Sequence, residues 1–288
     1  MFDYDAERLR DVILQLTRSN ISPEATLWFS GKLDISETSA INAAFSLIPR
    51  KTGVSVIKLR SFDRESISTI KPGLSVEGWT ADRLCRVCLL LHLDAPDKDT
   101  YFKTIEALFL AAEMNELVAL YSALPLLAYP DIWRMRCAEG IRSNIGGVLE
   151  AIMHHNPYPA KHLDEKAWNQ LVLKAFFTDK DVNKIYGLDE RANAELALIL
   201  SDYAHERWAA GRKVNPLLWR LTTNYIDGRI LDDLKRVFRE GDMPERQAAA
   251  LAVHGSSSKD AKELLDDHKD LSADIKRGKL KWESLGEG

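Results

Sequence analysis

The sequence predicts an all-α protein, because apolar residues recur with helical spacing along most of the chain. The first such segment places Leu9, Val12, Ile13 and Leu16 at positions i, i+3, i+4 and i+7, so they share one face of a helix. Helix-ending residues separate these segments. Gly211, for example, follows "HERWAA" at the point where a glycine in the left-handed conformation would close a helix.

Two similar helix starts near the C-terminal end favour a repeated arrangement. Asn215 precedes Pro216, and Asp242 lies three residues before Glu245; both patterns are typical of helix N-termini. The two starts lie 27 residues apart (242 − 215), and each is expected to open a helix, a turn and a second helix. This pattern predicts helical hairpins stacked as in an α-solenoid, with an irregular bundle as the alternative.

The helical pattern weakens between residues 51 and 78. "VSVIKL" is β-branched, and Pro72, Gly73 and Gly78 interrupt the segment. We expect a long connection here that could hold a short strand pair near residues 54–70. The sequence therefore predicts an N-terminal helical region over residues 1–78 and a helical domain over residues 79–288.

The composition is that of an ordinary folded protein. Of the 288 residues, 45% are hydrophobic and 28% are charged, and the formal net charge of −4 does not favour nucleic-acid binding. The opening residues lack the apolar core of a signal peptide, and no segment approaches the roughly 18 apolar residues of a membrane span. Three cysteines, an odd number, suit a reducing compartment. We expect a cytoplasmic protein without membrane insertion, and its oligomeric state stays open.

The cysteines and histidines do not predict a metal site. Cys85 and Cys88 form a CxxC motif inside an expected helix, which favours core packing and leaves a redox or metal role as the alternative. His154, His155 and His162 match no zinc-ligand spacing. The sequence therefore predicts neither a metal nor another cofactor.

Residues 151–170, "AIMHHNPYPAKHLDEKAWNQ", gather polar side chains between two expected helices. Pro157 and Pro159 restrict the residues that precede them, so Asn156 and Tyr158 are expected on a stiff, extended connection. Such a connection can hold side chains in place for binding, or it can simply end one helix before the next. We call residues 154–164 the elbow.

Three elbow residues are candidates for catalysis. His155 and His162 could act as a general acid or base, because the ordinary pKa of histidine lies near neutrality. Tyr158, which lies between the two prolines, could orient a substrate.

Further polar residues are candidates for substrate binding: Arg136, Glu139, Arg142, Asn144, Asn156 and Asn169. An arginine supplies a fixed positive charge for an anionic or polar ligand, whereas an intrahelical Arg136–Glu139 pair on a solvated face is the alternative. We expect four side chains of this region to line one cavity: Arg142, Asn156, Tyr158 and His162.

Two pairs of residues that contain aspartate, near the C-terminal end, favour structural roles. Asp202 and His205 have the i, i+3 spacing of a local hydrogen bond on a helix. Asp232 and Asp233 are expected at the beginning of a helix, where negative charge is favourable.

Four motifs between residues 107 and 253 resemble the EboA-domain family: Asn156–Pro159, Ala167–Gln170, Asp202–Trp208 and Pro216–Trp219. The resemblance implies a bacterial cytosolic protein that is linked to gene clusters for specialised metabolites. It also implies a role in handling or exporting metabolite precursors, and it marks residues 79–288 as an EboA-like helical domain.

These observations support three hypotheses about function. The first is an accessory protein of specialised-metabolite biosynthesis or trafficking that binds a small metabolite or docks a pathway enzyme. The second is a metal-independent biosynthetic enzyme that uses histidine acid/base chemistry on a small molecule. The third is a pure protein–protein scaffold. A cavity lined by both Arg142 and Tyr158 would favour the first two, and a flat apolar surface on the C-terminal hairpins would favour the third.

Overall fold

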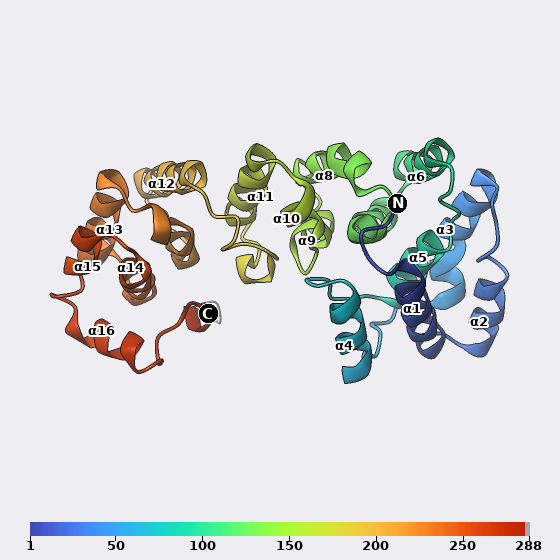
Figure 1. Cartoon of the computed structure of the whole chain (residues 1–288), viewed down its shortest axis with the longest axis horizontal. Helices are drawn as coiled ribbons and strands as arrows, with labels where there is room; N and C mark the ends of the chain where they lie inside the picture. Colours follow the sequence, from blue (N-terminus) through green and yellow to red (C-terminus); the bar gives the residue numbers. More distant parts are fainter. Residues whose placement is uncertain (286–288) are drawn as a thin grey trace. The chain divides into compact units, whose positions relative to one another are not determined.

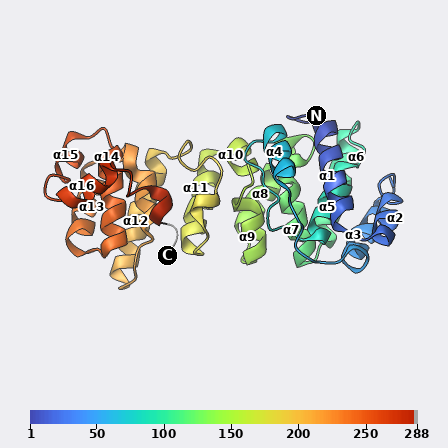
Figure 2. The same ribbon diagram turned by 90° about the horizontal axis from the view of Figure 1, so that it is seen from below.

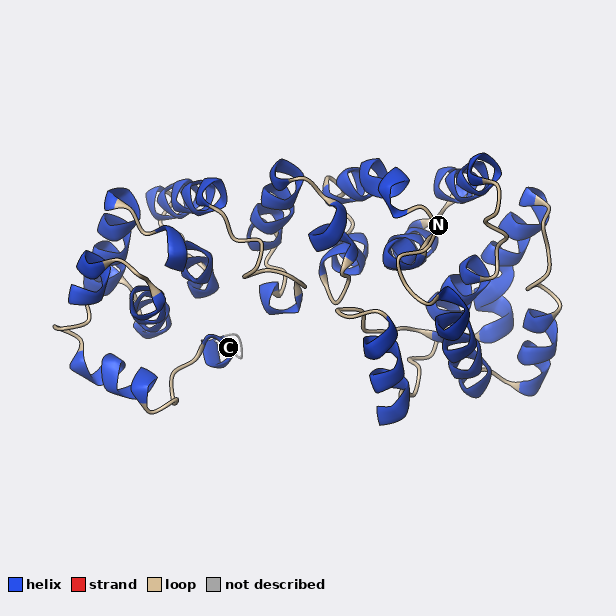
Figure 3. Ribbon diagram, viewed as in Figure 1, coloured by secondary structure: helices blue, strands red, loops and turns tan. Residues whose placement is uncertain are grey.

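The computed structural model describes residues 1–285 and consists of α-helices and 3-10 helices joined by loops (Figure 3). No strand occurs in that part of the chain, so the all-α prediction is confirmed. The chain divides into two compact units, Met1–Asp164 and Glu165–Gly288. Within residues 1–285, no helix is both long enough and apolar enough to cross a membrane.

The first unit contains ten α-helices and two short 3-10 helices: α1 (Ala6–Asn20), α2 (Pro23–Ser30), α3 (Thr38–Thr52), α4 (Ser61–Ile70), α5 (Ala81–Leu91), α6 (Lys98–Ala111), α7 (Met114–Ala123), η1 (Leu124–Leu126), η2 (Pro130–Trp133), α8 (Arg134–Ile141), α9 (Gly146–Met153) and α10 (Tyr158–His162). Helix α5 forms its centre and contacts α1, α3 and α7 (Figure 1). Every residue of α5 except Arg83 is buried.

The CxxC cysteines belong to this central helix. Cys85 and Cys88 are fully buried and have free thiols. Burial raises the pKa of both thiols to about 12, which keeps them protonated at neutral pH. These surroundings agree with the core-packing interpretation.

The strand pair expected near residues 54–70 does not form. Residues 61–70 are helix α4, and its first turn is fixed by Arg60, whose backbone N–H and guanidinium both donate to the Asp63 carboxylate. Val56 instead forms an isolated antiparallel bridge with Thr80, which is too short to make a strand. The domain boundary predicted at residue 78 differs from the division into compact units at residue 164, and it stays a prediction.

The second unit contains six α-helices and three 3-10 helices within the described residues: α11 (Glu165–Phe177), η3 (Val182–Lys184), α12 (Ala194–Ala209), η4 (Pro216–Tyr225), α13 (Gly228–Glu240), α14 (Met243–Gly255), α15 (Lys259–Glu263), α16 (Lys269–Lys276) and η5 (Trp282–Leu285). Helices α12, α13 and α14 lie side by side (Figures 1 and 2). Helix α14 also packs on η4.

The predicted helix ends of this unit are confirmed. Asn215 caps η4 by accepting from the Leu217 N–H, and Asp242 forms a capping box with Glu245 at the start of α14. Gly211 has a φ of 66° just beyond α12, and the Arg212 N–H donates to the Arg207 carbonyl across it. The segment after Asn215 is a 3-10 helix, and the stacking of hairpins as a solenoid stays a prediction.

Candidate functional site

Asn156 is held by the backbone around the elbow. Its side chain is 3% exposed, and its Nδ2 donates to the carbonyls of Tyr121 and Ala151 at 3.1 and 2.8 Å. Its Oδ1 accepts from the Tyr158 N–H at 3.0 Å. Both ends of the amide therefore stabilise the turn between α9 and α10, in a manner typical of asparagine in turns.

Tyr158 is also buried, and its hydroxyl donates to the Pro130 carbonyl at 2.5 Å. The ring of His162 lies over it, with 4.7 Å between the ring centroids. Burial lowers the pKa of His162 and raises that of Tyr158. At neutral pH this pair is therefore a neutral imidazole on a neutral phenol.

The elbow is not the extended connection that the prolines predicted. Tyr158–His162 form the short helix α10, with Pro157 as its N-cap and Pro159 in its first turn. A proline is tolerated there because the first N–H groups of a helix have no partner within the helix. His155 precedes this helix with a φ of 51°, in the left-handed region, and its carbonyl accepts from the Ser75 N–H.

The remaining candidates of the first unit lie on or after α8. Arg136 contacts two carboxylates: Glu106 of α6, at 2.5 and 2.7 Å, and Glu139 one turn further on, at 2.7 Å. The hydrogen bonds that Arg136 donates to the Glu106 carboxylate raise the pKa of Arg136. Arg142 and Asn144 are exposed beyond the C-terminal end of α8.

Asn169 lies in the second unit, in α11. It is 2% exposed and exchanges hydrogen bonds with Asn193, the N-cap of α12. The pair joins the two helices, because Asn193 also accepts from the Leu196 N–H at 2.8 Å. The contacts of Asn156, Tyr158 and Asn169 are thus structural, and a ligand-binding role for any of the predicted site residues stays a prediction.

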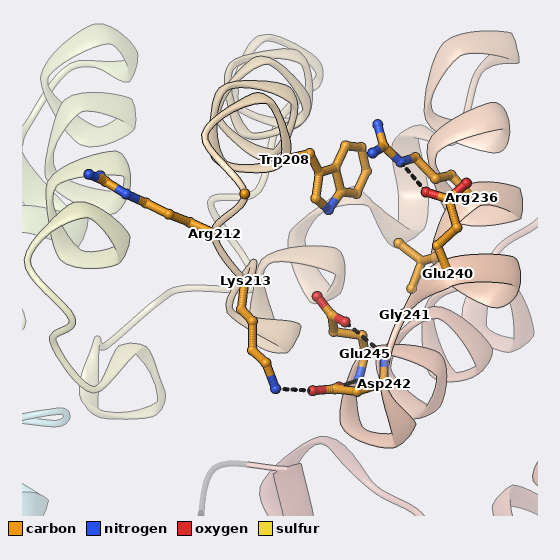
Figure 4. A pocket seen from close by; sticks show the side chains of 10 residues that line it. Trp208, Arg212, Lys213, Arg236, Glu240, Gly241, Asp242 and Glu245 are labelled. Atoms are coloured by element: carbon orange, nitrogen blue, oxygen red, sulfur yellow. Dashed lines mark hydrogen bonds and ion pairs between the residues drawn. The ribbon is translucent and has the colours of Figure 1, made fainter.

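The second unit also contains a pocket that the sequence analysis did not predict (Figure 4). Its volume is about 310 Å³. One side is the end of α12 and the turn after it, from Trp208 to Lys213, and the other is the end of α13 with the start of α14, from Arg236 to Glu245. We call it the Trp208 pocket.

Trp208 forms an aromatic wall of this pocket. Its ring stacks on the buried ring of Trp219, 6.0 Å away between centroids, and the Arg236 guanidinium lies over it at 4.3 Å. In Figure 4 the indole nitrogen points into the pocket, toward the carboxylate of Glu245. The Arg212 side chain points away from the pocket.

Ion pairs border the pocket. Lys213 contacts Asp242 at 2.7 Å, and Arg236 contacts Glu240 at 2.9 Å. The hydrogen bond from Lys213 lowers the pKa of Asp242. Glu245 accepts from the Asp242 N–H through Oε2, and its carboxylate faces the pocket. It forms no ion pair within residues 1–285, and its charge contributes to the raised pKa of Lys213.

The turn from α13 to α14 depends on a glycine. A Cβ at Gly241 would lie 2.6 Å from the Val237 carbonyl and 3.1 Å from the Glu245 Cβ. Any other residue would have to push the beginning of α14 away from α13. Gly241 therefore allows the close approach that brings Glu245 opposite Trp208.

The aspartates of α12 and α13 have other partners than the sequence predicted. Asp233 lies inside α13 and is 4% exposed; its Oδ1 contacts the His205 Nε2 at 2.5 Å, and its Oδ2 accepts from the Ser201 hydroxyl at 2.6 Å. Asp202 pairs with Arg229 instead of His205. The predicted local hydrogen bond between Asp202 and His205 is therefore wrong. The packing of α12 against α13 brings Asp233 to His205 instead.

The chain was compared with protein families, curated proteins and solved structures, and it matches a family. No curated protein and no solved structure matches the chain significantly. A family described as metabolite traffic protein EboA matches residues 9–223, and this match begins and ends earlier than the resemblance over residues 107–253. It includes Trp208 and Trp219, the stacked aromatic pair of the pocket. Because the match covers most of the sequence, the chain belongs to the EboA family.

Proposed function

We propose that this protein is an accessory protein of metabolite traffic that binds a small polar metabolite in the Trp208 pocket. The family description is consistent with a metabolite-related role. The observation that carries the proposal is the placement of an indole N–H donor opposite an acceptor carboxylate, Glu245, within one pocket. A ligand that offers both an acceptor and a donor would satisfy both groups at once.

The size and the polarity of the pocket support this function. About 310 Å³ lies at the small end of the roughly 300–1,000 Å³ typical of ligand pockets. The ion pairs at its border have exposed partners, such as Lys213 with 81% of its side chain accessible. Exposed ion pairs are worth only about 0–1 kcal/mol, so a ligand can displace or join them at small cost.

Two substitutions test the proposal without removing the fold. Trp208→Phe keeps an aromatic ring against Trp219 and removes the N–H donor. Glu245→Gln removes the charge, and glutamine is as suitable as glutamate at the third position of a capping box. Trp28→Phe, at a half-buried tryptophan of the first unit, is the matched control.

The measurement is the recovery of small molecules from the protein purified from its native host. We expect mass spectrometry to find a metabolite bound to the wild type and to Trp28→Phe. We expect at least tenfold less of it with Trp208→Phe and with Glu245→Gln. Equal amounts of the metabolite from all four proteins would refute the proposal that it binds in the Trp208 pocket. A bound metabolite whose mass changes on incubation would favour the enzyme hypothesis, with His155 and His162 as the first residues to substitute.

A further inference from the structure

A second cavity lies in the first compact unit and has a different character. Its volume is about 350 Å³. It lies between the loop after α2, the start of α3, the end of α5 and helix α6. Five side chains give it apolar walls: Leu33, Ile35, Ile41, Leu93 and Tyr101.

His92 provides a hydrogen-bond acceptor at this cavity. Its Nδ1 lies 2.8 Å from the Cys88 carbonyl oxygen. A carbonyl can only accept, so Nδ1 carries the hydrogen and Nε2 of the neutral ring is left with a lone pair. Burial lowers the pKa of His92, and the nearby Arg10 acts in the same direction. The ring is therefore neutral at pH 7.

Two carboxylates complete the lining. Asp34 and Asp94 are both exposed at the cavity, and neither forms an ion pair with another residue of the described chain. None of the residues that line the cavity, all of which are described, is a lysine or an arginine. Arg10 lies outside it, with its Nε donating to the Leu91 carbonyl at 2.8 Å. The cavity thus combines apolar walls with two carboxylates that form no ion pair within residues 1–285, although Arg10 and Arg18 lie near enough to lower the pKa of His92.

We propose that this cavity binds a small organic cation, an ammonium group carried on an apolar body. The ammonium would be attracted to Asp34 and Asp94 and would donate to the acceptor of His92. The apolar body would cover the leucine and isoleucine walls, which gives a free-energy gain roughly proportional to the area removed from water. A neutral analogue keeps only the gain from burying apolar surface, and an anion is repelled by the two carboxylates. This site is independent of the Trp208 pocket.

The test uses benzylammonium as the probe, with benzyl alcohol and benzoate as neutral and anionic analogues of similar shape. Binding to the full chain is followed by two-dimensional amide NMR and by calorimetry at low salt. We expect saturable shifts around Asp34 and Asp94, affinity for benzylammonium at least tenfold above that for benzyl alcohol, and no binding of benzoate. Added salt should weaken the binding of the cation.

Asparagine substitutions separate a charge effect from a general loss of structure. Asp34→Asn and Asp94→Asn remove charge from exposed positions, so both variants are expected to melt like the wild type. Together they should lower the affinity for benzylammonium at least tenfold. Asp99→Asn, at an exposed aspartate of α6 outside the lining, is the control and should bind like the wild type.

Equal affinity for benzylammonium and benzyl alcohol would overturn the proposal, and so would wild-type affinity in the double variant. Trp208→Phe should leave the binding of benzylammonium unchanged. A failure of this proposal therefore leaves the proposed function of the Trp208 pocket untouched, and the reverse also holds.

Discussion

Replacing Asn156 by alanine tests whether the elbow is a structural turn. The substitution removes two hydrogen bonds to carbonyls and leaves the buried Tyr158 N–H without its acceptor. With about 1 kcal/mol for each lost bond and about 1 kcal/mol more for the unsatisfied N–H, the free energy of unfolding should fall by about 3–4 kcal/mol. Asn156→Asp should be at least as harmful, because it places a carboxylate against two carbonyl oxygens.

Urea unfolding, followed by circular dichroism, measures the effect. Asn115→Ala is the matched control: this asparagine is exposed in the first turn of α7 and belongs to the same compact unit. It should change the free energy of unfolding by no more than about 0.5 kcal/mol. If Asn156→Ala is as mild as the control and yet abolishes ligand retention, the structural reasoning is refuted and the predicted binding role of Asn156 gains support.

Two further predictions concern the second unit. Trp168 is fully buried in α11, so Trp168→Ala should lower the free energy of unfolding by about 3–5 kcal/mol, whereas alanine at the 67% exposed Phe177 should have little effect in the same urea titration. Asp242 has a pKa below its ordinary value of 3.8, lowered by the hydrogen bond from Lys213. Its contribution to stability is therefore complete above about pH 5 and is lost as the pH falls through the lowered pKa. The difference in the free energy of unfolding between wild type and Asp242→Asn should accordingly shrink as the pH is lowered from 6 to 3. A constant difference would contradict the stabilising role of the Lys213–Asp242 hydrogen bond.

Features that depend on neighbours along the chain could be predicted from the amino-acid sequence. Helical spacing predicted that Leu9, Val12, Ile13 and Leu16 share one face of a helix. In α1, Leu9, Ile13 and Leu16 are fully buried and Val12 is half-buried. Helix ends were also predictable, because an N-cap such as Asp242 and a closing glycine such as Gly211 act on backbone groups only a few residues away. The resemblance to the EboA family came from such local motifs as well, and the family match confirmed it.

Contacts between residues that are distant in the sequence depend on how the helices pack, and the sequence did not predict them. The sequence places Asp202 one helical turn from His205. In the structure, however, Asp202 forms an ion pair with Arg229 of α13, and His205 contacts the buried Asp233. The elbow prolines indicated an extended connection, yet Asn156 bonds to the carbonyl of Tyr121, 35 residues away, and the chain turns into α10.

The walls of both cavities come from segments that are separated in the sequence. The spacing of residues along one helix carries no information about pairs such as Trp208 and Glu245. Helix packing fixes these contacts, because each buried face accepts only those partners that fill it and satisfy its polar groups.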